Sequence, residues 1–409
     1  MYINIKSTNS SVKKIFVVLL ISLFVFSQEL RSILGPKNYT VNILGTISIF
    51  VLLIKNLKAI NKKKLAFLYI TMIMYIFSSA FYENNLMKIF TGSIIVVFPL
   101  ILTIIEVNKD ILRDIFKQTI IILNLIVISI TIIGVLEIVF NLNINSNFSP
   151  FFSSRLQEQI FSNSVSENKR LYSFMGHPLF NTELYLLFFV LNILFSKYFK
   201  EKPCPIWVLI TAVIGVAFTA SKSGFVLLSF IIIFLFKYNN RIKKVTIAIS
   251  SIIIAFYSGL FDNLISRFFS GTLTSGRNEM WFKIRESNIF PIKFFTGYGR
   301  GFTFQINSYM EWASAAFEYP LRMFSLELGV IMTIMIYIFI MVIPIITLVK
   351  RKQYYLLYSY LVIFIDVNTF NGLSTSGDKM IIFCLFIFLV LNLSNYIREI
   401  DGNNEKNLE

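Results

Sequence analysis

Long runs of apolar residues, separated by short polar stretches, recur along the whole chain. A run of about 18 or more apolar residues can cross the hydrocarbon layer of a membrane as one helix. The period-two alternation that a membrane-spanning β-barrel requires is absent from these runs. The pattern therefore predicts an all-α polytopic integral membrane protein with a single membrane domain over residues 1–409. We expect twelve transmembrane helices, at about 13–33, 40–57, 65–82, 87–106, 116–140, 179–198, 205–220, 223–237, 244–261, 322–349, 354–371 and 378–396.

The distribution of basic residues predicts how the helices are oriented across the membrane. The runs "KNLKAINKKK" (55–64) and "NNRIKK" (239–244) fall between predicted helices, on the side where both termini lie. Cytoplasmic connections of membrane proteins are enriched in Lys and Arg. Both termini are therefore predicted to be cytoplasmic, with 397–409 as a flexible polar tail.

The composition agrees with a membrane protein. Hydrophobic residues make up 56% of the chain and charged residues only 15%, whereas soluble domains are about a quarter charged. The net charge of +16 is explained by basic cytoplasmic loops, so we expect no nucleic-acid partner. The two cysteines, Cys204 and Cys384, fall in or beside predicted helices and cannot form a disulfide framework.

Two predicted outer connections, 141–178 and 262–321, are unusually long. Loops longer than about 15 residues are usually functional or disordered. The second contains "GRNEMWFKIRESNIFPIKFFTGYGRGF" (276–302), which combines Arg and Lys with aromatic residues and glycine turns. We expect it to fold onto the membrane surface, with a short interfacial helix in "NEMWFKIRESNIF" and its cations gathered together. From position alone, binding of lipid headgroups explains these cations equally well.

Candidate residues also occur in two shorter motifs. "RLYSFMGHPLF" (170–180) holds Arg170 and the sole histidine, His177, and a lone histidine is more often structural than catalytic. Arg170 is the better functional candidate, because a guanidinium group matches phosphate geometry. "TASKSGFVLL" (219–228) places Lys222 at the outer face, where its ammonium group either snorkels to water or forms part of an anion site at a helix start.

Acidic residues at or within predicted helices are a third group. In "FEYPLRMFSLELGVI" (317–331), Glu318 and Arg322 are four residues apart and would share a helical face as an ion pair. Glu327 lies deeper in the same predicted helix, and an intramembrane carboxylate is a functional candidate. Further ionisable residues at membrane depth are Glu137, Glu183 and Asp366.

The order of these motifs resembles that of the O-antigen polymerase and O-antigen ligase superfamily of bacterial surface-polysaccharide assembly. The resemblance covers 165–330 by motif and the whole chain by layout. It rests on an "R…G…hP" stretch, an "S-K-S-G" turn between two short helices, an "sGR…W" element, a "GxGxG" turn and an "E.G" pair at a helix start. The first stretch consists of Arg170, Gly176, His177 and Pro178, and the turn of Ser221 to Gly224. The "sGR…W" element consists of Ser275, Gly276, Arg277 and Trp281. The "GxGxG" turn consists of Gly297, Gly299 and Gly301, and the last pair of Glu327 and Gly329.

The resemblance implies a metal-independent glycosyltransferase without a cofactor, located in the bacterial inner membrane. Its substrate would be a polyprenyl-pyrophosphate-linked oligosaccharide. Its other partners would be membrane lipid and a chain-length regulator. The two outer loops would form its active-site face. Glu318 would be the catalytic residue, as the general base or as the group that orients the acceptor, with His177 and Glu327 as supporting residues. The cations expected to bind the pyrophosphate are Arg170, Lys222, Arg277, Arg300 and Arg322.

Three functions remain open. Ligase-like members carry a histidine where this chain has Glu318, which favours a polymerase of O-antigen or capsular repeat units. The alternatives are a ligase that transfers finished glycan to an acceptor, and a flippase or other transporter of lipid-linked oligosaccharides, which also has about twelve spans.

Overall fold

The computed structural model describes residues 5–35, 41–83, 85–166, 169–200, 202–236, 277–309, 318–373 and 377–406. Every regular element in these ranges is a helix of the α, 3₁₀ or π type, and the β-bridge between Ser173 and Gly176 is isolated. The all-α prediction is confirmed for this part of the chain.

Several helices are suited to a membrane. Five in the described ranges are long and apolar enough to cross one: Leu86–Ile104, Lys109–Val139, Pro178–Lys200, Val330–Lys350 and Lys379–Ile400. Shorter apolar helices cover Ile43–Asn56, Ile206–Thr219 and Lys222–Leu235. By length and composition, these helices suggest a helical membrane protein, whereas the predicted number of twelve spans is not confirmed. The span predicted at 244–261 lies outside the described residues.

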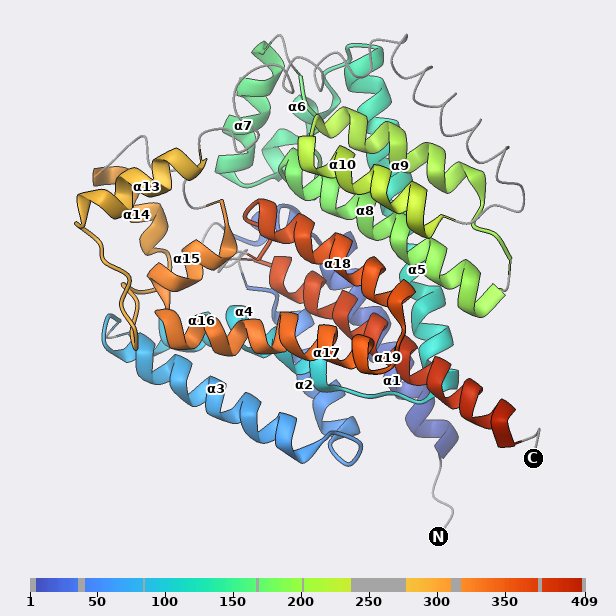
Figure 1. Cartoon of the computed structure of the whole chain (residues 1–409). Coiled ribbons are helices and arrows are strands. Elements are labelled where there is room, and N and C mark those ends of the chain that lie inside the picture. The colour runs from blue at the N-terminus through green and yellow to red at the C-terminus, as the bar shows by residue number, and fades with distance from the viewer. Residues whose placement is uncertain are drawn as a thin grey trace. The chain divides into compact units, whose positions relative to one another are not determined.

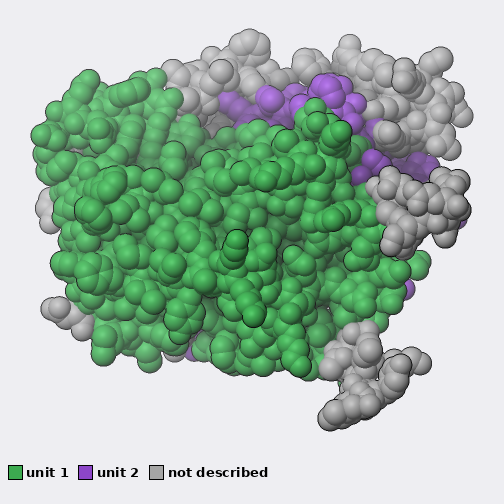
Figure 2. All heavy atoms as spheres, turned by 60° about the horizontal axis from the view of Figure 1, so that its bottom comes forward, with its two compact units in different colours: residues 1–19, 41–115, 274–409 green, residues 20–40, 116–273 purple. Residues whose placement is uncertain are grey.

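The first compact unit comprises residues 1–19, 41–115 and 274–409 (Figure 2, green). Helix α19 packs in this unit against the 3₁₀ helix η3 and against α17 and α18. Its middle turns are apolar on all sides and buried, which is typical of a helix at the centre of a bundle. The helices are α1 (Ile5–Leu20), α2 (Ile43–Asn56), α3 (Lys62–Ala80), α4 (Leu86–Val96), η3 (Phe98–Ile104), α13 (Arg277–Ser287), α14 (Phe302–Tyr309), α15 (Pro320–Glu327), α16 (Val330–Tyr337), η9 (Ile338–Val342), α17 (Ile343–Lys350), α18 (Tyr354–Thr369) and α19 (Lys379–Lys406).

The second compact unit comprises residues 20–40 and 116–273. Helix α8 is buried on nearly all sides and packs against α9 and α10 (Figure 1). Polar contacts between helices add to this packing, because the Thr131 hydroxyl lies 2.9 Å from that of Tyr185. The helices are η1 (Ile21–Val25), η2 (Leu30–Leu34), α5 (Lys109–Gly134, shared with the first unit), η4 (Val135–Val139), α6 (Ile144–Phe148), η5 (Ser149–Phe151), α7 (Ser154–Val165), α8 (Pro178–Phe195), η6 (Ser196–Lys200), α9 (Ile206–Thr219), α10 (Lys222–Phe230) and η7 (Ile231–Leu235).

Three predicted boundaries are wrong. The helix predicted at 13–33 ends at Val25, where Arg31 folds back and donates hydrogen bonds to the carbonyl groups of Ser22 and Phe26 at 3.2 and 2.8 Å. The helix predicted at 322–349 begins at Pro320 and is broken at Gly329. Helix α19 continues to Lys406, so the tail predicted to be flexible begins as helix.

Candidate functional site

The predicted outer loop 262–321 is described over 277–309 and 318–321, and this part is folded. The expected short helix is present as α13. Buried Ile284 of α13 packs with Ile306 of α14 and Leu326 of α15, with the aromatic side chains of Trp281 and Phe290 around them. This small apolar core holds α13 and α14 on the broken helix α15–α16.

The "GYGRG" turn wraps around the end of α15. The backbone N–H groups of Tyr298 and Gly299 donate to the carbonyl groups of Leu326 and Glu327 at 2.8 and 3.1 Å. The N–H of Val330, at the start of α16, donates to the carbonyl of Lys293 at 3.1 Å. The loop therefore satisfies backbone groups that the break leaves without helical partners.

Two arginines meet beside α13, and we call Arg277 and Arg322 the arginine pair. The Arg322 guanidinium donates to the backbone carbonyl of Arg277 at 3.1 Å and to the side-chain oxygen of Asn278. It lies over the ring of Tyr319, 4.4 Å from the ring centre, while the Arg277 guanidinium lies 5.9 Å from the same centre. Cation–π contacts and hydrogen bonds thus hold like charges close together.

Glu318 completes this group by forming an ion pair with Arg277. Arg277 also donates to the carbonyl of Thr369, at the end of α18, at 3.2 Å. The predicted pairing of Glu318 with Arg322 on one helical face is wrong, because α15 begins only at Pro320. Glu318 is 37% exposed and Arg277 17% exposed, so this group is accessible from outside.

The electrostatics favour an anion. Burial lowers the pKa of Arg322, the Tyr319 ring partly offsets this, and the positive charge of Arg277 lowers the pKa further. The arginine pair with Glu318 carries a net single positive charge. An anionic ligand would relieve the repulsion between the guanidinium groups, and arginine is suited to bidentate contacts with phosphate.

The other cations of the basic stretch are not gathered here, contrary to prediction. Lys293 donates to the Tyr82 hydroxyl at 2.8 Å and lies 4.0 Å from the centre of the Tyr298 ring. Arg300 lies against α4, since a Cβ on Gly92 would come within 3.4 Å of its Cδ. Lys283 and Arg285 are exposed on α13. Arg277 is the only cation of this stretch that joins Arg322 in the described residues.

Glu327 has a structural partner. Its carboxylate is 1% exposed and accepts hydrogen bonds from the N–H of Thr303, at 3.3 Å, and from the Thr303 hydroxyl. It thereby holds the first turn of α14 against the end of α15. These contacts are with the loop, and the supporting role in catalysis predicted for Glu327 stays a prediction.

In the second unit, Arg170 is attached to the turn that carries Lys222. Its Nε donates to the Thr219 carbonyl at 2.9 Å, next to Ala220, whose φ of +49° ends α9. The hydroxyl of Ser221 accepts from the N–H of Gly224 at 3.1 Å and caps α10, of which Lys222 is the first residue. The Arg170 side chain is therefore bonded to the turn that directly precedes Lys222.

His177 caps a helix. Its Nδ1 accepts a hydrogen bond from the N–H of Leu179 at 3.2 Å, and the ring packs edge-on against Tyr172. An accepting Nδ1 has no proton, so the neutral ring carries its proton on Nε2. The helix cap and the ring contact give His177 a structural role in this part of the chain.

Asn278 and Tyr319 are the site residues that the motifs missed. Tyr319 directly precedes Pro320, and an aromatic residue three positions before Arg322 is a signal for a cation–π contact at a helix start. Asn278 carries no such signal, because its contact with Arg322 depends on the tertiary packing of α13.

Comparisons with known proteins leave the motifs as the only guide to a family. No protein-family model, curated protein or solved structure matches the chain.

Proposed function

We propose that the protein polymerises lipid-linked oligosaccharide repeat units at the outer face of the bacterial inner membrane. The single observation that supports this best is the arginine pair, held on Tyr319 beside Glu318. Adjacent guanidinium groups in a partly exposed, aromatic setting suit the pyrophosphate of a polyprenyl-linked glycan. The finer topology belongs to the same proposal: twelve spans, with both termini in the cytoplasm.

The reaction transfers a glycosyl group. A hydroxyl oxygen of the incoming repeat unit forms a bond to the anomeric carbon of the growing chain, and the bond from that carbon to the pyrophosphate oxygen breaks. Negative charge develops on the departing polyprenyl pyrophosphate. Arg277 and Arg322 are proposed to stabilise this charge, as fixed hydrogen-bond donors do at other charged transition states.

Glu318 is proposed as the base that accepts the hydroxyl proton. In the described structure its carboxylate pairs with Arg277. A pyrophosphate bound to Arg277 would compete for the same guanidinium group and free the carboxylate for the acceptor hydroxyl. General-base action requires the two oxygens to be within hydrogen-bond distance.

In the second unit, Arg170 and Lys222 form a separate basic group, proposed to bind a phosphate group of the lipid-linked substrates. The Arg170 contact with the Thr219 carbonyl fixes its orientation. Each group can be tested separately by substitution.

The decisive experiment uses purified protein in lipid vesicles with a lipid-linked repeat unit, and measures chain lengthening by gel electrophoresis. Arg277→Ala and Arg170→Ala should each abolish long products. Arg285→Ala is the matched control, because Arg285 is exposed on the same helix as Arg277 and lies outside the arginine pair. If both test variants still make products of full length, the proposal is wrong.

A deletion strain separates polymerase from ligase. Loss of a polymerase leaves single repeat units on the cell surface, whereas loss of a ligase leaves long chains on the carrier lipid. A flippase would tolerate removal of the α13–α14 region, which a polymerase would not.

A further inference from the structure

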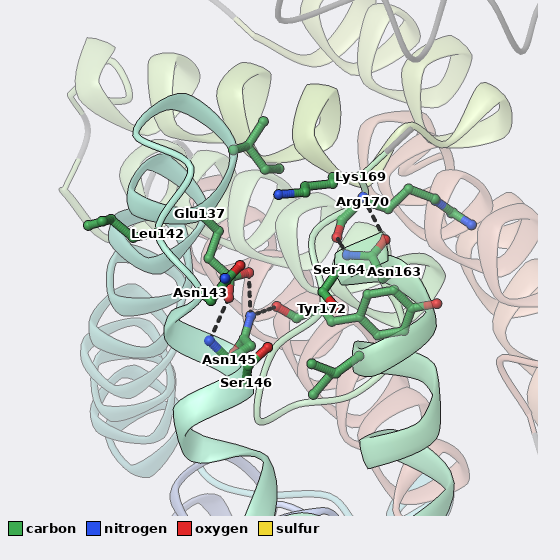
Figure 3. A pocket seen from close by; sticks show the side chains of 12 residues that line it. Glu137, Leu142, Asn143, Asn145, Ser146, Asn163, Ser164, Lys169, Arg170 and Tyr172 are labelled. Atoms are coloured by element: carbon green, nitrogen blue, oxygen red, sulfur yellow. Dashed lines mark hydrogen bonds between the residues drawn. The ribbon is translucent and has the colours of Figure 1, made fainter. Parts of the chain in front are cut away.

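A small polar hollow lies in the second unit, outside the arginine pair (Figure 3). Its walls are formed by the end of α5–η4, by α6 and α7, and by residues 169–172. The cavity volume is about 20 Å³. This is room for one or two water-sized groups, such as hydroxyl groups.

Glu137 forms the fixed acceptor of the hollow. It lies on the π-helical turn η4, and π-helical turns are frequent at functional sites. Its carboxylate accepts hydrogen bonds from the backbone N–H and the side-chain amide of Asn145, at 2.5 and 2.6 Å. The same amide of Asn145, which is 3% exposed, donates to the Tyr172 carbonyl at 2.8 Å. The carboxylate is thereby held in one orientation, and each oxygen keeps a further lone pair for a ligand.

Lys169 provides a donor on the facing wall. Its ammonium donates to the side-chain oxygen of Asn141 at 2.5 Å and acts electrostatically on Glu137. Figure 3 shows Lys169 reaching across the hollow while the Arg170 side chain points away from it. The Arg170 backbone is held by Asn163, whose side chain bonds to both its N–H and its carbonyl.

This set of groups selects against charged ligands. An anion would meet the Glu137 carboxylate, and a cation would meet the Lys169 ammonium. A hydroxyl group both donates and accepts, so it can satisfy the carboxylate and the ammonium together. The side chains of Asn143, Ser146 and Ser164 add neutral polar groups to the walls.

We propose that the hollow binds hydroxyl groups of a neutral sugar residue through Glu137, Asn143 and Lys169. This inference rests on the proposed function, which supplies glycan as the substrate, and it names a sugar subsite separate from the arginine pair. The sugar ring would lie across the mouth of the hollow, because only its substituents fit inside.

The test is saturation-transfer NMR on the full chain in lipid nanodiscs. The probes are the methyl glycosides of glucose, galactose, mannose and N-acetylglucosamine, with methyl glucuronide as the anionic comparison. Glu137→Gln removes the charge at nearly constant shape. Asn143→Ala keeps the bonds between Glu137 and Asn145, and so provides a variant that preserves the framework. Glu158→Gln is the control, because Glu158 is exposed on α7 and does not line the hollow.

At least one neutral glycoside should bind the wild type and Glu158→Gln equally. Its affinity should fall about tenfold in Glu137→Gln, as expected for loss of a charged hydrogen bond, and should also fall in Asn143→Ala. The proposal is overturned if no neutral glycoside binds, if the glucuronide binds best, or if both test variants bind like the wild type. If the wild-type protein lengthens glycan chains but binds no glycoside, the sugar subsite is refuted and the proposed polymerase function is not. Glycoside binding without lengthening refutes the proposed reaction alone.

Discussion

Gly297 is the position where a single methyl group should most clearly disturb the folded outer loop. A Cβ at this residue would lie 2.1 Å from the carbonyl carbon and oxygen of Glu327 and 2.4 Å from the nitrogen of Leu328. Ordinary contacts of a Cβ are 3.4–4 Å, so Gly297→Ala must push the "GYGRG" turn away from α15 by more than an ångström.

The expected cost follows from the contacts that separate. Overpacking costs about 1–3 kcal/mol. The two backbone hydrogen bonds from Tyr298 and Gly299 to the end of α15 contribute about 1 kcal/mol each. Gly297→Ala should therefore destabilise the protein by about 3–5 kcal/mol.

Gly301→Ala is the matched control for this prediction. Gly301 has a φ of +81° and no atom within 4 Å of an added Cβ, so alanine there meets only the backbone penalty of about 1–2 kcal/mol. Thermal unfolding of both variants in detergent, followed by tryptophan fluorescence, should place Gly297→Ala well below Gly301→Ala. If Gly297→Ala unfolds at the same temperature or higher, the close contact between the turn and α15 is wrong.

Substitutions at three further residues test the predicted site residues. Arg322→Lys keeps the charge but loses the contacts of the forked guanidinium with the Arg277 carbonyl and Asn278, so the rate of chain lengthening should fall about tenfold. An unchanged rate would exclude bidentate binding of the pyrophosphate by Arg322. Glu318→Gln should lower the rate by about 10²–10⁴-fold at unchanged binding of the lipid-linked donor, and a wild-type rate would remove Glu318 as the base. His177→Ala should lower the free energy of unfolding by about 1 kcal/mol because the helix cap is lost, whereas His177→Asn retains a capping acceptor. If His177→Asn folds but no longer lengthens chains, the imidazole ring itself takes part in the reaction.

The helices could be predicted because a helix that crosses a membrane requires a long run of apolar residues, which is visible in the sequence. The long spans at α5, α8 and α19 agree with those runs. The break before α16 could not be located in this way. It depends on the backbone carbonyl groups of Lys293 and Phe294, which accept hydrogen bonds from the N–H groups of Val330 and Ile331 and belong to a loop some distance away in the sequence. The apolar residues on both sides of Gly329 read as one continuous span, and only its positive φ in the folded chain interrupts it.

Cations were easier to find than their partners. Charged residues stand out in a hydrophobic chain, so Arg277, Arg322, Arg170 and Lys222 could be named as candidates from the sequence. The contacts of Arg322 with the Arg277 carbonyl and of Arg170 with the Thr219 carbonyl could not. Lys293 and Arg300 had the same appearance in the sequence. Two aromatic neighbours, Tyr82 and Tyr298, hold Lys293 in the structure, whereas Arg300 lies against Gly92 of α4.

The partner of Glu318 depends on where α15 begins, and the sequence does contain a signal for that boundary. Proline is favoured at the first position of a helix, because its missing N–H needs no partner there. Pro320 therefore predicts Tyr319 as the capping residue and leaves Glu318 outside the helix, where it cannot share a face with Arg322. Outside the helix, Glu318 reaches Arg277, which is the first residue of α13. The same boundary makes Tyr319 the residue before the helix, and its ring centre lies 4.4 Å from the Arg322 guanidinium and 5.9 Å from that of Arg277. The start of α15 at Pro320 therefore contributes to the geometry of the arginine pair.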